Sequence, residues 1–430
     1  MPETSDEAGR LDMKRARRRS CIAVVQVAVL YSAMTAVLPG LTNAQNLADF
    51  EKRMTEFTLG NGLKFLVLER HQAPLVSFLI YADVGSVDEV VGITGLAHLF
   101  EHMAFKGTKT IGTRDHKAEE KAMARIDQAF LALKAERRKG DRADKTRLEK
   151  LENLFKDAQE QAQKYLVHDE YEEAFERAGS LGLNAGTSGD GTAYVVSLPS
   201  NKVELWMMME SDRFANPVLR EFYKEKDVVM EERRLEENSP FGRLVEEFMA
   251  VAYKAHPYGH PVVGYMSDLE TLTRAEAQAF FTKYYSPSNL TIAIVGDVQP
   301  QQIRKLATKY FSGIPSGPKP DPVETVEPPQ SGERRVVLED PSQPLIMIGY
   351  HRPSISHPDN PVFRAFAEII GAGRTSRLQK SLVKDKKIAV SVEVRAGGGK
   401  YPGLFTFMAV PAEGHTPEEC ERFKVVQGDP

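Results

Sequence analysis

The spacing of apolar residues predicts a chain that alternates short strands with amphipathic helices. Residues 54–70 are expected to form two strands joined by a turn at Asn61-Gly62. A third strand over 75–84 is followed by a loop and then by a helix that contains His98. Downstream, the same patterns predict strands within 183–198 and over 290–295, and helices over 201–217, 219–238, 273–284 and 300–311.

Residues 116–178 have a different composition, because they are dense in lysine, arginine, glutamate and alanine. Apolar residues recur at helical spacing on both sides of a break at Gly140-Asp141, which predicts two antiparallel helices in a hairpin. We interpret this hairpin as an insertion, a solvated charged arm attached at the rim of its domain. Replacing residues 118–176 with a short linker should then leave the domain folded.

A linker rich in proline, glycine and glutamate at 316–334 divides the chain. After it, the pattern predicts a helix over 362–370 and strands over 335–338, 345–350, 390–394 and 404–410. We therefore predict an α+β fold. Its first domain, 45–315, is an antiparallel or mixed sheet backed by helices, and its second domain, 335–430, is an incomplete copy of the first.

The composition excludes some classes of protein. The chain has 430 residues, 42% of them hydrophobic, which suits a soluble protein with a sizeable core. Its net charge of −4 gives no indication of nucleic-acid binding. The two cysteines, Cys21 and Cys420, do not fall in a metal-binding or disulfide pattern.

Residues 1–44 are expected to be a signal peptide. A basic stretch at 13–19 precedes a mostly apolar, uncharged run at 21–38, and the small residues Thr42 and Ala44 suit cleavage before Gln45. The mature protein would then be periplasmic or secreted. The alternative is an uncleaved membrane anchor, because the 18 residues of the run are close to the length that spans a bilayer.

Residues 98–102 carry the clearest chemistry. His98 and His102 lie four positions apart, so on a helix both imidazoles share one face and can reach one metal ion. Glu101 projects toward the same face and can take a proton from water activated by zinc. The alternative is a surface helix with two solvated histidines. The apolar residues that flank the histidines argue against this alternative; they are Leu96, Leu99, Phe100, Met103 and Phe105.

Two histidines leave a zinc ion in need of a third protein ligand. The acidic helix at 225–237 offers several carboxylates. Glu225 and Glu232 are seven residues apart and so share a face. Spacing alone does not choose between these two and their competitors, Glu231, Glu236 and Glu237.

The order of these motifs resembles the insulinase/pitrilysin family of zinc peptidases, the inverzincins, in its bacterial branch similar to processing peptidases. The resemblance extends over about residues 54–415. It is carried by residues 85–89 and 95–108, which include the two histidines, and by 184–187, 225–232, 285–289, 296–297 and 371–378.

The resemblance implies that His98, His102 and Glu232 bind one zinc ion per chain and that Glu101 is the general base. It implies that Glu225 is an acidic residue that contacts the zinc ligands without binding the metal itself. It also implies substrate contacts, which are the edge-strand residues Asn184 and Ala185 and the pocket residue Phe105. Ordinary core packing is an equally good interpretation of Phe105.

The sequence departs from the family pattern in three places. His102 and Glu232 are 130 residues apart, longer than is usual, and the hairpin accounts for the excess. The family's Arg, followed seven residues later by Tyr, is replaced by Val383 and Val390. The second domain ends early, which suggests truncation or a frameshift. We therefore expect a homodimer, or a heterodimer with a homologous subunit that supplies the Arg and Tyr.

The most concrete functional prediction is a zinc-dependent endopeptidase that hydrolyses short or unfolded peptides. The first alternative is a catalytically silent or truncated insulinase-like subunit that serves as an assembly partner. Glu101 argues against it, because a structural zinc site needs no base. The second alternative is a non-enzymatic protein that binds peptides along the strand of Asn184.

Overall fold

A computed structural model describes residues 51–422 of the chain. The predicted signal peptide at 1–44, with Cys21, and the last eight residues lie outside this range. Within it, Cys420 is buried and forms no disulfide. No helix among these residues combines the length and the apolar character needed to cross a membrane.

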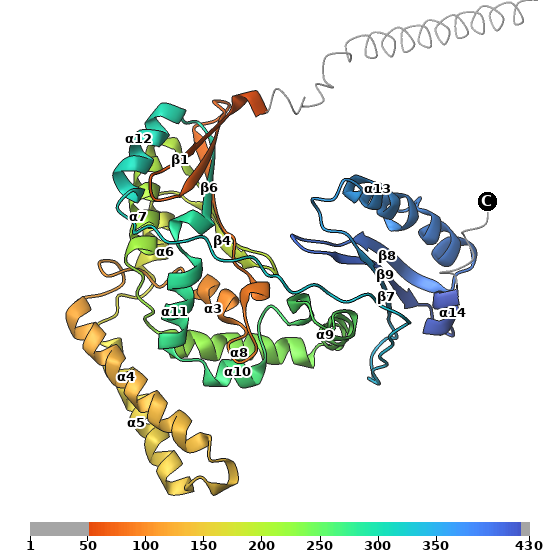
Figure 1. Cartoon of the computed structure of the whole chain (residues 1–430), viewed down its shortest axis with the longest axis horizontal. Coiled ribbons are helices and arrows are strands. Elements are labelled where there is room, and N and C mark those ends of the chain that lie inside the picture. The colour runs from red at the N-terminus through yellow and green to blue at the C-terminus, as the bar shows by residue number, and fades with distance from the viewer. Residues whose placement is uncertain (1–50, 423–430) are drawn as a thin grey trace, which may run out of the picture. The chain divides into compact units, whose positions relative to one another are not determined.

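The first sheet is mixed, as predicted. Its six strands follow the order β1 (Met54–Thr58), β2 (Lys64–Glu69), β6 (Leu290–Gly296), β3 (Leu75–Ala82), β5 (Thr192–Pro199) and β4 (Leu181–Thr187) (Figure 1). Strand β6 runs parallel to β2 and antiparallel to β3, and β5 is antiparallel to both β3 and β4. The central strand β6 therefore comes from the far end of the domain.

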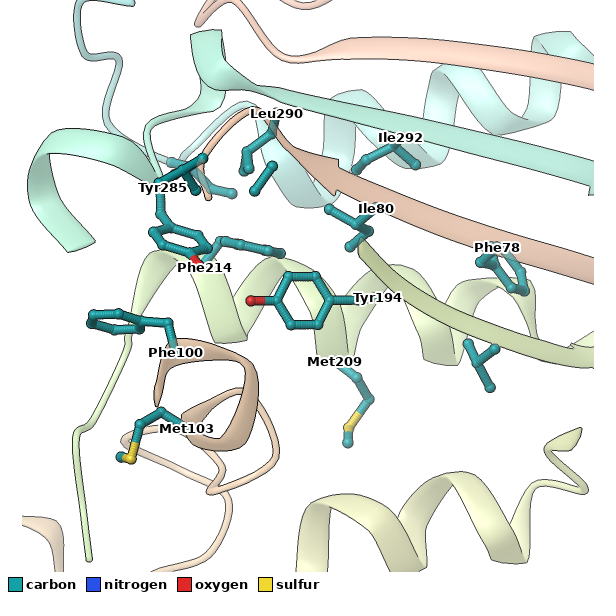
Figure 2. Packing of buried hydrophobic residues seen from close by; sticks show 14 of the residues in the cluster. Phe78, Ile80, Phe100, Met103, Tyr194, Met209, Phe214, Tyr285, Leu290 and Ile292 are labelled. Carbon is teal, nitrogen blue, oxygen red and sulfur yellow. The ribbon is translucent and has the colours of Figure 1, made fainter. Parts of the chain in front are cut away.

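Helices cover the sheet and close its core. Helix α3 (Leu96–Met103), which carries the two histidines, packs against β4 and β5. Figure 2 shows its Phe100 and Met103 in the same cluster as Ile80 of β3 and Leu290 of β6. Other helices of this part are α7 (Val203–Ala215), α8 (Phe222–Asn238), α9 (Pro240–Ala252), α11 (Arg274–Tyr284) and α12 (Pro300–Phe311). The pattern did not predict α9.

The charged segment forms two packed helices, as predicted. They are α4 (His116–Arg137) and α5 (Lys145–Gln163), and a short 3-10 turn at Gly140–Arg142 separates them. The prediction that the whole segment sits at the rim is wrong. Phe130 of α4 is buried in the main core, and so are Tyr171 and Phe175 of the short helix α6 (Glu170–Arg177). A helix rich in charge can still bury one apolar stripe.

The second sheet has three strands, β7 (Ile346–Arg352), β9 (Gly403–Pro411) and β8 (Ala389–Ala396), in that order. Helix α13 (Asn360–Gly371) packs on β8, and a π-helical turn (Gln379–Asp385) and helix α14 (Pro417–Glu421) complete this part. The predicted strand at 335–338 is wrong, because residues 315–345 contain neither helix nor strand. Val337 there is 76% exposed.

Candidate metal centre

The first turn of α3 is held by a buried carboxylate from the preceding loop. The N-cap residue, Gly95, has φ 89° and no side chain to cap the helix. Glu89 replaces the missing cap, because its two carboxylate oxygens accept hydrogen bonds from the backbone N–H groups of Gly95 (2.8 Å) and Ala97 (2.7 Å). Burial raises the pKa of Glu89 to about 8, against these two hydrogen bonds, which lower it.

A second carboxylate fixes the loop on the other side. Asp268, in the short helix α10 (Met266–Thr271), accepts hydrogen bonds from Gly92 N–H (2.8 Å) and from the Thr94 hydroxyl (2.7 Å). A Cβ at Gly95 would lie 2.5 Å from the carbonyl oxygen of Val263, so only glycine fits there. These contacts set the position of α3 and hence of both histidines.

Helices α3 and α8 bring three of the predicted ligands together. Glu232 Oε2 lies 3.6 Å from His98 Nε2, and Glu232 Oε1 lies 3.6 Å from His102 Nε2. One ligand atom from each of the three residues lies within 4.8 Å of the other two. The two imidazole rings are nearly perpendicular, with centroids 4.9 Å apart.

The chemistry of these groups fits a zinc ion. Two imidazole nitrogens and one carboxylate oxygen are a donor set found at catalytic zinc, which leaves a position open for water. Burial lowers the pKa of His98, and the neighbouring His102 lowers it further. The neutral imidazole is the form that binds a metal.

Glu225 lies behind His102, on the side away from Glu232. Its Oε2 is 3.7 Å from His102 Nδ1, and its Oε1 is 2.6 Å from Lys106 Nζ. Burial alone would raise the pKa of Glu225, but His102 and Lys106 together hold it below its ordinary value. A carboxylate at the second ring nitrogen orients a histidine ligand. The sequence motif included Lys106 but gave it no role.

The competing carboxylates on α8 point elsewhere. Glu231 is 69% exposed and pairs with Arg234. Glu236 and Glu237 both pair with Arg233, on another face of the helix. Of the five candidate acids on α8, only Glu232 therefore lies near both histidines. Glu225 lies near His102 alone.

Glu101 lies in α3 between the histidines in sequence and is half-buried. Its charge acts on both imidazoles, alongside that of Glu232. Within residues 51–422, no hydrogen bond or salt bridge holds the carboxylate of Glu101. A carboxylate in this position can exchange a proton with a molecule bound beside the ligands.

The predicted substrate residues lie on an edge strand. Asn184 and Ala185 pair with Val195 and Tyr194 of β5 on one side, and β4 has no strand neighbour on its other side within residues 51–422. Helix α3, which carries His98 and His102, packs against this strand. Phe105 is half-buried and packs against the core, which agrees with the packing interpretation.

The two valines that replace Arg and Tyr lie in the second part of the chain. Val383 packs against a small apolar cluster, and Val390, in β8, is 57% exposed. Neither side chain can donate a hydrogen bond to a peptide.

Comparisons with known proteins match two family descriptions. Residues 64–136 and 158–265 match the model described as "Insulinase (Peptidase family M16)", and residues 271–426 match "Peptidase M16 inactive domain". The first match has a gap at residues 137–157, which form the distal part of the helical hairpin.

Curated relatives of the chain are named zinc proteases. The chain is 28% identical to zinc protease PqqE of Helicobacter pylori over 340 residues, which is 77% of this chain and 64% of the relative. It is 24% identical to an uncharacterized zinc protease of Mycobacterium leprae, over 78% of this chain and 64% of the relative. The chain therefore spans less than two thirds of the length of these relatives.

Solved structures share the fold. A protease from Helicobacter pylori superposes with a TM-score of 0.70 at 25% identity, covering 86% of this chain and 78% of that chain. A peptidase M16 inactive domain from Pseudomonas fluorescens superposes with a TM-score of 0.63 at 19% identity, covering 84% and 75%.

Proposed function

Because the chain belongs to the insulinase family of peptidases, we propose that it is a zinc-dependent endopeptidase that hydrolyses short or unfolded peptides. The observation that carries the proposal is the convergence of His98, His102 and Glu232, from two helices, on one point. The names of the curated relatives support zinc as the metal.

Each residue of the site has a task in this reaction. His98, His102 and Glu232 would hold one zinc ion, which supplies a Lewis acid for the peptide carbonyl and the attacking water. Glu101 takes a proton from that water and delivers it to the nitrogen of the leaving amine. Glu225, braced by Lys106, keeps the His102 ring in position.

The substrate would lie along the open edge of β4. An extended peptide can add to this edge by backbone hydrogen bonds, which depend little on its sequence. Asn184 and Ala185 then hold the peptide beside the ligands, because β4 packs on α3. An unfolded or short peptide suits this mode, since its backbone groups are free to pair.

The enzyme would need help to hold its substrate. Val383 and Val390 stand where many relatives have an Arg and a Tyr, so we propose that a homologous subunit supplies these groups. We further propose that the protein acts in the periplasm or outside the cell, on the basis of the basic and apolar pattern of residues 1–44.

A second function is favoured by one observation. Residues 271–426 match a domain described as inactive. A chain that binds peptides along β4 and assembles with an active subunit would fit this match. Glu101 separates the two functions, because only hydrolysis needs a base.

The test compares the wild-type chain with Glu101→Gln, which keeps the size of the side chain but cannot accept a proton. We expect the variant to retain one zinc ion per chain and to lose about 10² to 10⁴-fold in the rate of hydrolysis of an unstructured peptide. Metal analysis and a peptidase assay measure both. Equal rates in the two proteins would favour the binding function.

A further inference from the structure

Arg220 is a buried arginine in the segment between α7 and α8, and it is 3% exposed. Its guanidinium donates to both carboxylate oxygens of Glu119, with Nε 2.7 Å from Oε1 and Nη2 3.1 Å from Oε2. It also donates to three backbone carbonyl oxygens, which are those of Lys106 (2.5 Å), Thr108 (2.7 Å) and Ile111 (2.8 Å). An arginine side chain has five N–H groups, so all of these donors are used.

The three carbonyl groups lie in one loop, residues 106–112, which follows closely after α3 and its two histidines. This loop wraps tightly around the guanidinium. A Cβ at Gly107 or at Gly112 would lie 2.8 Å from Nη1 of Arg220, so a side chain is excluded at both positions. The guanidinium therefore fills the interior of loop 106–112 and fixes its path.

Lys106 connects this loop to the metal centre. Its carbonyl oxygen accepts a hydrogen bond from Arg220, and its Nζ lies 2.6 Å from Glu225 Oε1. Glu225 Oε2 in turn lies 3.7 Å from Nδ1 of His102, on the ring whose other nitrogen faces Glu232. Because a carboxylate at the second ring nitrogen orients a histidine ligand, the position of Lys106 bears on the orientation of His102.

The charge of Arg220 needs a partner, because an unpaired guanidinium is costly to bury. Glu119 supplies that partner. It is 1% exposed and lies in the first turn of α4, so this carboxylate comes from the helical hairpin. One ion pair thus joins the hairpin to loop 106–112 and to a residue that precedes the start of α8 by two positions.

We propose that Arg220 is a positioning residue of the metal centre and that Glu119 enables it to act. Arg220 holds the loop that leads out of α3, which carries His98 and His102. It also stands just before α8, which carries Glu232. A residue fixed at both places holds the two ligand-bearing helices together at one end, and a metal site needs its ligands placed to within about 0.5 Å. The inference rests on the zinc site proposed above and gives the hairpin a part in it.

The test is the zinc affinity of the full-length chain, measured by competition with a chelator. Glu119→Gln should raise the dissociation constant for zinc about tenfold or more, as is usual when a group that supports a metal ligand is lost. This variant leaves a buried charge unpaired and can unfold the chain, so the double variant Glu119→Gln/Arg220→Met accompanies it. The double variant removes the charge together with the hydrogen bonds to the loop, so it should stay folded and show the same loss of affinity.

Asp127 offers a matched control on the same helix, α4. It pairs with Arg274 of α11, with Oδ2 2.5 Å from Nη2, and it accepts a hydrogen bond from Tyr223 of α8. These contacts also fasten the hairpin to the domain, but neither partner lies in loop 106–112. Asp127→Asn should therefore lower the midpoint of urea denaturation and leave the zinc affinity unchanged.

Wild-type zinc affinity in the folded double variant would overturn the proposal. An equal loss of affinity in Asp127→Asn would overturn it as well, because any loosening of the hairpin would then have the same effect. Circular dichroism and urea denaturation establish that each variant is folded. A wild-type chain that binds no zinc would overturn the zinc site itself and this inference with it. Since the readout is zinc binding, none of these outcomes depends on whether the chain hydrolyses peptides.

Discussion

Glu231 and Glu232 are neighbours on α8, yet the turn of the helix gives them different surroundings. Glu232 lies 3.6 Å from both His98 Nε2 and His102 Nε2, whereas Glu231 is exposed and pairs with Arg234. A carboxylate that lies between two imidazoles can complete a metal site, whereas an exposed ion pair contributes little to the stability of the fold. The two residues therefore form a matched pair for a test.

We predict that Glu232→Gln loses zinc and that Glu231→Gln keeps it. Three protein ligands are usual at catalytic zinc, so removing one should weaken binding strongly. The zinc content of the dialysed proteins and a competition titration against a chelator measure the effect. Undiminished zinc in Glu232→Gln would remove this residue from the site, and loss of zinc in Glu231→Gln would move the ligand by one position.

The sequence alone could predict only part of this site. The spacing of His98, Glu101 and His102 indicated the helix of the candidate metal site, because neighbours on one helix are fixed by its periodicity. Spacing could not choose Glu232, because the direction of α8 relative to α3 depends on tertiary packing, and only the resemblance to the insulinase family implied this residue. The roles of Glu89 and Asp268 were missed for the same reason, since their contacts with the loop before α3 depend on how that loop folds back.

At the scale of single elements, the helical hairpin shows how composition can mislead. The helical spacing of its apolar residues correctly predicted two helices, but its charge density led to the interpretation of the whole segment as a solvated arm. Phe130 is buried between the rings of Tyr223 (4.5 Å between centroids) and Phe155 (5.4 Å). Glu119 is likewise buried in a pair with Arg220, with Glu119 Oε1 2.7 Å from Arg220 Nε. These buried contacts argue against the expectation that residues 118–176 can be replaced without loss.

We predict that Phe130→Ala destabilises the protein by about 3–5 kcal/mol, because it leaves a cavity between α4 and α8. Leu131 is the adjacent residue and is 53% exposed, so Leu131→Ala should change the free energy of unfolding by less than about 0.5 kcal/mol. Urea denaturation of both variants measures the difference. Equal effects would mean that α4 does not pack on α8 as described.

At the scale of the whole molecule, the strands of both sheets were predicted, and one further predicted strand, at 335–338, does not form. Strands such as β3 and β6 have strict alternation of buried and open positions, which the sequence displays directly. Residues 335–338 have a similar apolar content but form no strand, because a strand exists only where another strand pairs with it. Local pattern cannot reveal whether that partner is present.

We predict that the purified chain alone is a weak peptidase and that a homologous subunit bearing the Arg and Tyr raises its rate. The proposed ligands and base lie together, but orienting the peptide can be worth several kcal/mol. The peptidase rate on an unstructured peptide, with and without such a subunit at saturating zinc, measures the gain. A chain that alone turns over peptide at roughly 10 per second, the median for enzymes, would contradict this prediction.

The late position of β6 in the chain has a consequence for biosynthesis. Strands β2 and β3 are made early but do not touch each other, because β6, at 290–296, lies between them. At ribosomal speeds of about 5–20 residues per second, the nascent chain waits roughly 10 to 45 seconds after β3 for this strand. Until then the sheet cannot close around its core. For the export that we propose, such a delay would keep the first domain unfolded during translocation, which requires an unfolded chain.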